Sequence, residues 1–295
     1  MANLLSLKNF SKEKIEKILN DAYFLERNQT ALQNKYKSKI LTLAFFEPST
    51  RTKLSFSAAA YKIGLDVLDY SSHFSSEKKG ESISDTIKIL EGYSDCIVIR
   101  HWDEKIFQTI QFSCPIINAG NGIDEHPTQA LIDLYTIKKE FGKIDGLNFL
   151  IVGDLKNGRT VHSLLLALRN YNVSVNLFCP NQLSLDKEFL SQLEGKLRIS
   201  YSKNFELENI DVLYMTRIQY ERFKSKKPKD LEKSYSLNLK LLKKAKDSLI
   251  ILHPLPRLAE LPTEIDKTKH AKYFLQAKNA IFVRMAILDY CLCND

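Results

Sequence analysis

The chain has 295 residues, of which 44% are hydrophobic and 26% charged, a composition typical of folded globular proteins rather than disordered ones. Its mean hydropathy is -0.24, and no apolar run reaches the about 18 residues needed to span a bilayer, which argues against a membrane protein. The formal net charge of +8 favours anionic ligands, and the N-terminal apolar run is too short for a secretory signal, so we expect a cytoplasmic protein.

Short apolar segments alternate with helical patterns along the chain. The apolar segments predict strands at residues 40–46, 67–70, 96–100, 115–118, 149–153, 174–179, 198–201, 212–215 and 249–252. The patterns between them predict helices at residues 52–62, 84–93, 127–139, 160–170, 237–245 and 273–292. This alternation indicates an α/β protein with parallel sheets and right-handed crossovers.

A polar, turn-rich segment at residues 138–145 separates the first four predicted strands from the last five. We therefore expect two open parallel-sheet α/β domains. In open parallel sheets, ligands bind beyond the carboxyl ends of the strands. Polar residues that directly follow strands are therefore the candidates for chemistry.

The first candidate site follows the strand at 40–46, where Ser49, Thr50, Arg51 and Thr52 open a helix. A helix N-terminus offers backbone N–H groups and a partial positive charge, and hydroxyl and guanidinium groups add donors for phosphate oxygens. Helix capping would explain one of these side chains but not four consecutive donors. We therefore favour an anion site here.

Two further strand ends carry groups that suit a carbonyl compound. Arg100 ends the strand at 96–100, where a solvated arginine is by itself an equally good interpretation. His126 precedes a proline that suits the first position of a helix, and Gln129 lies one turn along the same side. A histidine and an amide on one edge can polarise a carbonyl and hold an amide group, and we favour this hypothesis over simple capping.

Residues 153–160, GDLKNGRT, nearly match a nucleotide-binding P-loop. Arg159 replaces the P-loop lysine, and its planar fork pairs best with carboxylates, so the segment indicates carboxylate recognition more than nucleotide binding. Arg217 and Gln219 follow the strand at 212–215. Residues 253–257, HPLPR, predict a stiff turn whose carbonyls can face a ligand, although by itself the segment is best explained as an ordinary stiff loop.

The candidates concentrate arginines on strand-end loops, and Lys79 adds a cation in the polar loop at 75–81. A solvated loop is the simpler interpretation of that segment, and a substrate-closing lid is the alternative. The six histidines are scattered, and Cys291 and Cys293 lack a second Cys or His pair, so we expect no metal and no cofactor. The inventory suits an anionic phosphoryl donor bound beside a dicarboxylate, with catalysis by charge stabilisation and positioning.

The positive charge is concentrated in one segment, since residues 220–247 hold ten Lys or Arg against four Asp or Glu. A solvated lysine-rich surface is the simpler interpretation. No aromatic stacking motif accompanies the charge, so we expect no nucleic-acid partner and keep a basic RNA-binding protein as a remote alternative.

Four collinear motifs resemble the aspartate/ornithine carbamoyltransferase family: STRT at 49–52, HPTQ at 126–129, GDLKNGRTVHSL at 153–164 and HPLPR at 253–257. HPLPR and the Arg217-x-Gln219 pair favour the branch that uses aspartate, because ornithine enzymes carry a cysteine-containing segment in place of HPLPR. The resemblance implies carbamoyl transfer from carbamoyl phosphate to L-aspartate in pyrimidine synthesis, with an ornithine carbamoyltransferase as the nearest alternative.

The resemblance also implies roles for single residues. For carbamoyl phosphate binding these are Ser49, Thr50, Arg51, Thr52, Arg100, His126, Gln129, the Leu255 carbonyl, Ser75 and Lys79. For catalysis they are Arg51, Thr52, Arg100, His126 and Lys79, and for aspartate binding Lys79, Arg159, Arg217 and Gln219. Glu47 and Arg222 match positions that hold a closed state.

At the level of assembly, the resemblance implies a homotrimer in which Ser75 and Lys79 enter the neighbouring subunit's site, and it allows regulatory chains in a larger assembly. It implies a carbamoyl phosphate-binding domain at residues 1–127 with 279–295 and an aspartate-binding domain at 128–278. Long helices would join the domains, with the C-terminal helix returning to the first. Asn157 departs from the family pattern, which often has an aromatic residue or His there, so the packing of the Arg159 loop stays open.

Overall fold

The computed structural model describes residues 2–71, 80–222 and 235–293. The chain divides into two compact units, Met1–Tyr135 with Asn279–Asp295 and Thr136–Lys278. Both divisions fall inside long helices, α5 (Pro127–Phe141) and α10 (Tyr273–Leu292), which each run from one unit into the other. The predicted α/β fold with two parallel sheets and a C-terminal helix that returns to the first unit is confirmed.

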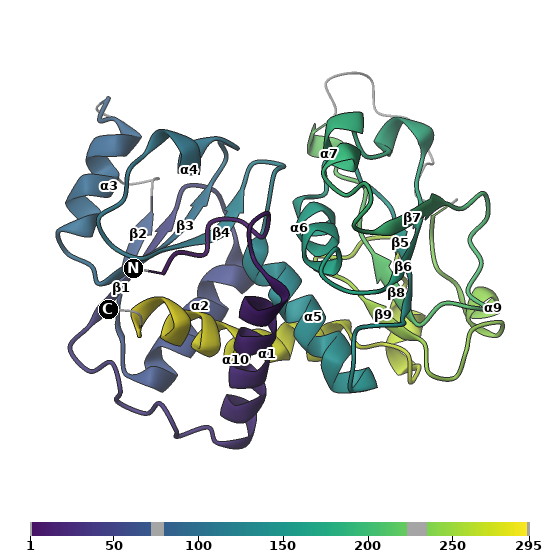
Figure 1. The fold of residues 1–295 in the computed structure, drawn as a ribbon, viewed down its shortest axis with the longest axis horizontal. Coiled ribbons are helices and arrows are strands. Elements are labelled where there is room, and N and C mark those ends of the chain that lie inside the picture. Colours follow the sequence, from purple (N-terminus) through teal and green to yellow (C-terminus); the bar gives the residue numbers. More distant parts are fainter. Residues whose placement is uncertain (1, 72–79, 223–234, 294–295) are drawn as a thin grey trace. The chain divides into compact units, whose positions relative to one another are not determined.

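The first unit contains a four-stranded parallel sheet in the order β2-β1-β3-β4 (Figure 1). Its strands are β1 (Ile40–Phe45), β2 (Asp66–Ser71), β3 (Cys96–His101) and β4 (Ile116–Asn121). Its helices include α1 (Lys12–Arg27), α2 (Thr50–Ile63), α3 (Ile83–Glu91) and α4 (Ile106–Thr109). Because β2 and β3 lie on opposite sides of β1, the strand order reverses between β1 and β3, which is where such sheets bind ligands.

Helices cover both faces of this sheet (Figure 1). Alternate residues of each strand point to opposite faces, so Ala44 and Ile99 pack with Ile87 of α3 and Ile106 of α4 in one apolar cluster. The other face meets α2 and α10, whose buried apolar side chains include Phe56. Burial on both faces explains why the strands read as continuously apolar.

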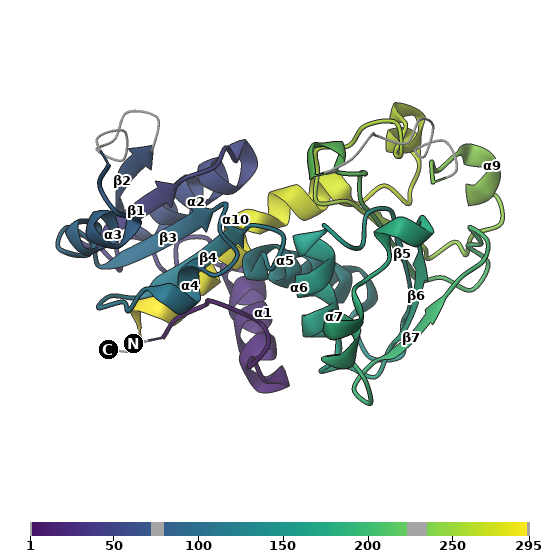
Figure 2. The ribbon, with the colours of Figure 1, turned by 90° about the horizontal axis from the view of Figure 1, so that it is seen from above.

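The second unit contains a five-stranded parallel sheet in the order β7-β6-β5-β8-β9 (Figure 2). Its strands are β5 (Asn148–Val152), β6 (Ser174–Phe178), β7 (Arg198–Tyr201), β8 (Val212–Met215) and β9 (Ile250–Leu252). Its helices include α6 (Arg159–Leu168), α7 (Lys187–Ser191) and α9 (Leu239–Leu242). The 3-10 turns η3 (Asn181–Leu183), η4 (Tyr220–Arg222) and η5 (Thr263–Lys267) also belong to it. The strand order reverses between β5 and β8.

All nine predicted strands are present, although β4 extends three residues beyond the predicted segment, to Asn121. The predicted helix at 237–245 is wrong in extent, because only the four residues of α9 are α-helical. After them the N–H groups of Lys244 and Ala245 bond to carbonyls three residues back, which tightens the chain into turns. α1 was not predicted.

Several sequence expectations fall on residues outside the described ranges. Ser75, Lys79 and the lysine-rich residues 224–229 are among them. Within the described ranges, no helix is both long and apolar enough to cross a membrane.

Candidate active site

The turn from β1 into α2 presents a row of hydrogen-bond donors. Ser49 is the N-cap residue of α2, yet its side chain makes no capping hydrogen bond. Thr50 and Arg51 are exposed, whereas Thr52 is buried at 6% exposure. Because the first N–H groups of a helix have no partner within it, this helix start can bind an anion.

A buried cation lies behind the same helix start. Arg284 of α10 is 2% exposed, and its Nη1 donates to the Thr52 carbonyl at 3.3 Å. Its guanidinium lies 4.5 Å from the centroid of the Phe56 ring, and its Nε has no hydrogen-bond partner among the described residues. Burial, with a smaller contribution from repulsion by Arg100, lowers the Arg284 pKa to about 9. The shift arises because removal from water makes the charged form less stable.

Arg100, at the end of β3, is held by an internal carboxylate. Its Nη2 lies 2.8 Å from Oε1 of Glu47, which follows β1, and its Nη1 donates to the Ala119 carbonyl at 3.2 Å. The Phe46 N–H donates to the Arg100 carbonyl at 2.8 Å and so joins the ends of β1 and β3. The guanidinium is therefore fixed at the carboxyl ends of the strands. An anion that bound there would compete with Glu47 for this guanidinium.

His126 and Gln129 lie where the sequence placed them, at the start of α5. His126 is buried at 4% exposure, with Nδ1 3.4 Å from Oγ1 of Thr128. Gln129 donates through Nε2 to Oδ1 of Asp133 at 2.7 Å, which orients its amide. The first unit thus gathers these two residues, Arg100 and the α2 start beyond the carboxyl ends of β4, β3 and β1.

In the second unit, the loop after β5 is organised around Asp154, which is fully buried. Its carboxylate accepts from the Asn157 N–H at 3.0 Å, from the Asn157 side chain at 3.1 Å and from the Gln219 N–H at 3.2 Å. Gly153 has φ +119°, and a Cβ there would lie 2.1 Å from the Thr216 carbonyl oxygen, so only glycine fits. The loop ends at Arg159, the first residue of α6. Asn157 stabilises the loop through its hydrogen bonds to Asp154.

The residues after β8 form a second cation group. Arg217 is bound by the Glu221 carboxylate through both terminal nitrogens, with Nη1 2.9 Å from Oε2. This pair raises the Arg217 pKa and lowers that of Glu221. Gln219 donates to the Asn157 carbonyl at 2.8 Å and accepts from Nε of Arg222 at 3.1 Å.

The turn after β9 is locked by a buried histidine and carboxylate. Leu255 has φ +55°, and its N–H donates to Nδ1 of His253 at 2.8 Å, so the proton of that ring sits on Nε2. Nε2 lies 3.0 Å from Oε1 of Glu260, which also accepts from the Leu258 N–H at 2.9 Å. Burial by itself would raise the Glu260 pKa, but these hydrogen bonds outweigh it and hold the pKa below its usual value.

Loops after β5, β8 and β9, which are neighbours in the sheet, therefore carry Arg159, Arg217, Gln219 and Leu255. The sequence interpretation missed Arg284, Glu221 and Glu260. Of these, only Glu221 left a signal in the sequence, namely its spacing of four residues from Arg217. Within the described ranges, no group of three or more His, Cys, Asp or Glu is placed to hold a metal ion.

Two family models cover nearly the whole chain. Residues 2–139 match the model described as aspartate/ornithine carbamoyltransferase, carbamoyl-P binding domain. Residues 145–291 match the model described as aspartate/ornithine carbamoyltransferase, Asp/Orn binding domain.

Individual relatives match over similar lengths. The aspartate carbamoyltransferase catalytic subunit of Thermococcus kodakarensis is 47% identical, with 98% of this chain and 96% of that protein aligned. The solved catalytic subunit of M. jannaschii aspartate transcarbamoylase superposes with a TM-score of 0.90 at 40% identity, over 100% of this chain and 99% of that one. Aspartate transcarbamoylase of Trypanosoma cruzi, solved with carbamoyl aspartate and phosphate, gives 0.89 at 37% identity, over 97% and 94%.

Proposed function

The chain belongs to the aspartate/ornithine carbamoyltransferase family, and from this premise we propose that it transfers the carbamoyl group of carbamoyl phosphate to L-aspartate. The products would be N-carbamoyl-L-aspartate and phosphate. The observation that carries the proposal is the placement of Arg217 and Gln219 directly after β8, beside the HPLPR turn and the Arg159 loop. Two guanidinium forks on neighbouring loops suit the two carboxylates of aspartate.

In the first unit, the α2 start would hold the phosphate of carbamoyl phosphate through Ser49, Thr50, Arg51 and Thr52. Arg100, Thr52 and His126 would donate to its carbonyl oxygen. Gln129 and the Leu255 carbonyl would accept from its NH₂ group. The match to a carbamoyl-P binding domain supports this assignment.

The reaction needs charge stabilisation rather than a covalent intermediate on the protein. The aspartate amine attacks the carbonyl carbon, and negative charge develops on the carbonyl oxygen of a tetrahedral intermediate. Each preorganised donor at that oxygen contributes about 10²–10³ in rate. His126 would donate as a neutral ring, and the phosphate leaves with the bonding electrons while the attacking amine loses its proton.

The domain assignment follows from the same roles. Residues 1–127 with 279–295 would bind carbamoyl phosphate and residues 128–278 would bind aspartate. Glu47, which now holds Arg100, would exchange this partner for Arg159 and Arg222 when both substrates are bound. Ser75 and Lys79 would come from a neighbouring subunit of a homotrimer, in the cytoplasm, at an early step of pyrimidine synthesis.

A direct assay separates this proposal from the ornithine alternative. Purified protein with carbamoyl phosphate should form carbamoyl-aspartate from aspartate and no citrulline from ornithine. Citrulline formed without carbamoyl-aspartate would refute the assignment. Omission of carbamoyl phosphate is the matched control, since neither product can then form.

A further inference from the structure

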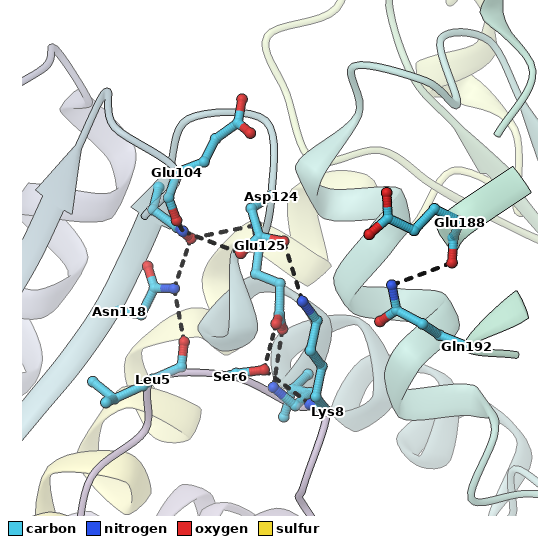
Figure 3. Close-up of polar contacts among 11 residues, drawn as sticks. Leu5, Ser6, Lys8, Glu104, Asn118, Asp124, Glu125, Glu188 and Gln192 are labelled. Carbon is cyan, nitrogen blue, oxygen red and sulfur yellow. Dashed lines mark hydrogen bonds and ion pairs between the residues drawn. The ribbon is translucent and has the colours of Figure 1, made fainter. Parts of the chain in front are cut away.

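Glu125, directly before His126, is a buried carboxylate that the proposed reaction does not use. It is 1% exposed. Its Oε1 accepts from the Ser6 hydroxyl (Figure 3), and its Oε2 accepts from the Leu7 N–H at 2.9 Å. Both oxygens are therefore bound by the N-terminal segment, residues 4–8.

That segment is itself attached to the sheet edge beside β4. The Leu4 N–H donates to the Ile116 carbonyl at 3.0 Å, and the Asn118 N–H donates to the Leu4 carbonyl at 2.9 Å. The Asn118 side chain donates to the Leu5 carbonyl at 2.8 Å (Figure 3). The partner of the Glu125 carboxylate is thus a fixed extension of the sheet.

The main chain of Glu125 is bound as well. The Asn121 N–H donates to the Glu125 carbonyl at 3.1 Å, and the Glu125 N–H donates to Oδ1 of Asn121 at 3.3 Å. These two hydrogen bonds fix the end of the loop from β4 to α5. They therefore also fix the backbone position of His126, the next residue. Movement of the Glu125 backbone would displace His126 with it.

The charged groups that act on Glu125 come from two segments, Lys8 from the N-terminal segment and Asp124 from its own loop. Burial raises its pKa to about 7, with a smaller contribution from Asp124 in its own loop, while the bonds from Ser6 and Leu7 and the charge of Lys8 oppose the rise. Lys8 pairs with Asp124 at 3.6 Å near the surface. The backbone carbonyl of Glu104, from the loop after β3, accepts from the Asn121 side chain at 2.6 Å and helps to hold this loop.

We propose that Glu125 is a positioning residue for the carbamoyl transfer proposed above: by tying the His126 loop to the N-terminal segment, its carboxyl group sets where the His126 ring meets the substrate carbonyl. It acts through His126 and touches no substrate. Because Glu125 titrates near neutrality, its charge state also enters the pH dependence of turnover.

The test compares Glu125→Ala and Glu125→Gln with Lys8→Ala, a matched control that removes the neighbouring charge and leaves the Glu125 hydrogen bonds in place. Misplacement of a reacting group predicts that Glu125→Ala lowers kcat by about tenfold to a hundredfold while KM for both substrates changes by less than about threefold. Glu125→Gln keeps an acceptor of the same shape, so its kcat should stay within about threefold and its pH profile should lose one ionisation near neutrality. Lys8→Ala should match the parent in kcat and in both KM values.

A second readout does not depend on activity. In histidine-labelled protein, the ring C–H signal of His126, identified by its absence in His126→Asn, should move in Glu125→Ala and stay in place in Lys8→Ala. An unmoved signal, or an unchanged kcat in Glu125→Ala, would overturn the positioning role. If the parent made no carbamoyl-aspartate but the signal moved as expected, the proposed function would fail while the contact between Glu125 and the His126 loop stood.

Discussion

The Glu221 carboxylate binds both terminal nitrogens of Arg217, which lies four residues before it in the chain. The arginine side chain is 26% exposed and the glutamate side chain 54%, so the pair lies at the surface of the candidate aspartate site. A two-point contact fixes the plane of the guanidinium, which a single contact cannot do. Glu221 therefore orients the group that should bind a substrate carboxylate.

This orientation predicts the effect of Glu221→Ala. The KM for aspartate should rise by about threefold to tenfold, because an exposed pair contributes about 1 kcal/mol. The affinity for carbamoyl phosphate should not change. Glu208→Ala, which removes another exposed ion pair of the same unit, is the control in steady-state kinetics. A lower KM for aspartate would show that Glu221 competes with the substrate instead.

Arg51 and Arg217 should affect different substrates. Arg51 lies in the first turn of α2, so Arg51→Ala should weaken binding of inorganic phosphate by at least about tenfold. Arg217→Ala should leave phosphate binding unchanged and raise the KM for aspartate by a similar factor. Calorimetric titration with phosphate and steady-state kinetics measure the two quantities. Equal effects of both variants on phosphate binding and on the KM for aspartate would contradict this division of roles.

The sequence was informative wherever a property is local. Continuous apolar runs such as the one in β1 predicted buried strands, and the donors at 49–52 predicted a helix start because both patterns depend on neighbouring residues. Pairs such as His253 with Glu260 depend on how a loop folds back, which periodicity does not report. Arg284 gives no signal in the sequence for the same reason, because its contact at Thr52 lies 232 residues away.

Shared sites predict complementation between defective chains. If Lys79 enters a neighbouring subunit's site, trimers that mix Arg51→Ala and Lys79→Ala chains should contain some sites with neither defect and regain activity. Activity is measured after dissociation and joint reassembly, with each variant reassembled alone as the control. Mixed trimers of verified composition that stay inactive would argue for sites built from a single chain.

The buried Glu260 predicts a pH-dependent stability of the second unit. Its pKa is depressed in the folded state, so its contribution is present above the pKa of the unfolded chain and is lost as the pH falls through the folded value. Glu260→Ala should lower the free energy of unfolding at neutral pH by about 3 kcal/mol, because His253 and Leu258 lose a buried acceptor. Urea denaturation measures this loss, and the difference from the parent should shrink in acid. The exposed Glu264, replaced by Ala, is the control, and an equal loss in both variants would exclude the buried pair as the cause.

The buried charge of Arg284 predicts opposite effects on stability and binding. In Arg284→Met a side chain of similar length removes a desolvated cation, so the free energy of unfolding should stay equal or rise, as for other buried charges replaced by apolar groups. The same change removes positive potential behind the α2 start, where a charge interaction of about 1–2 kcal/mol corresponds to roughly a tenfold loss of phosphate affinity. Arg284→Lys, which keeps the charge but not the guanidinium contact with Thr52, should bind phosphate with intermediate affinity. Calorimetry with phosphate and urea denaturation test both halves, and a Met variant that binds phosphate like the parent would show that the buried cation serves packing alone.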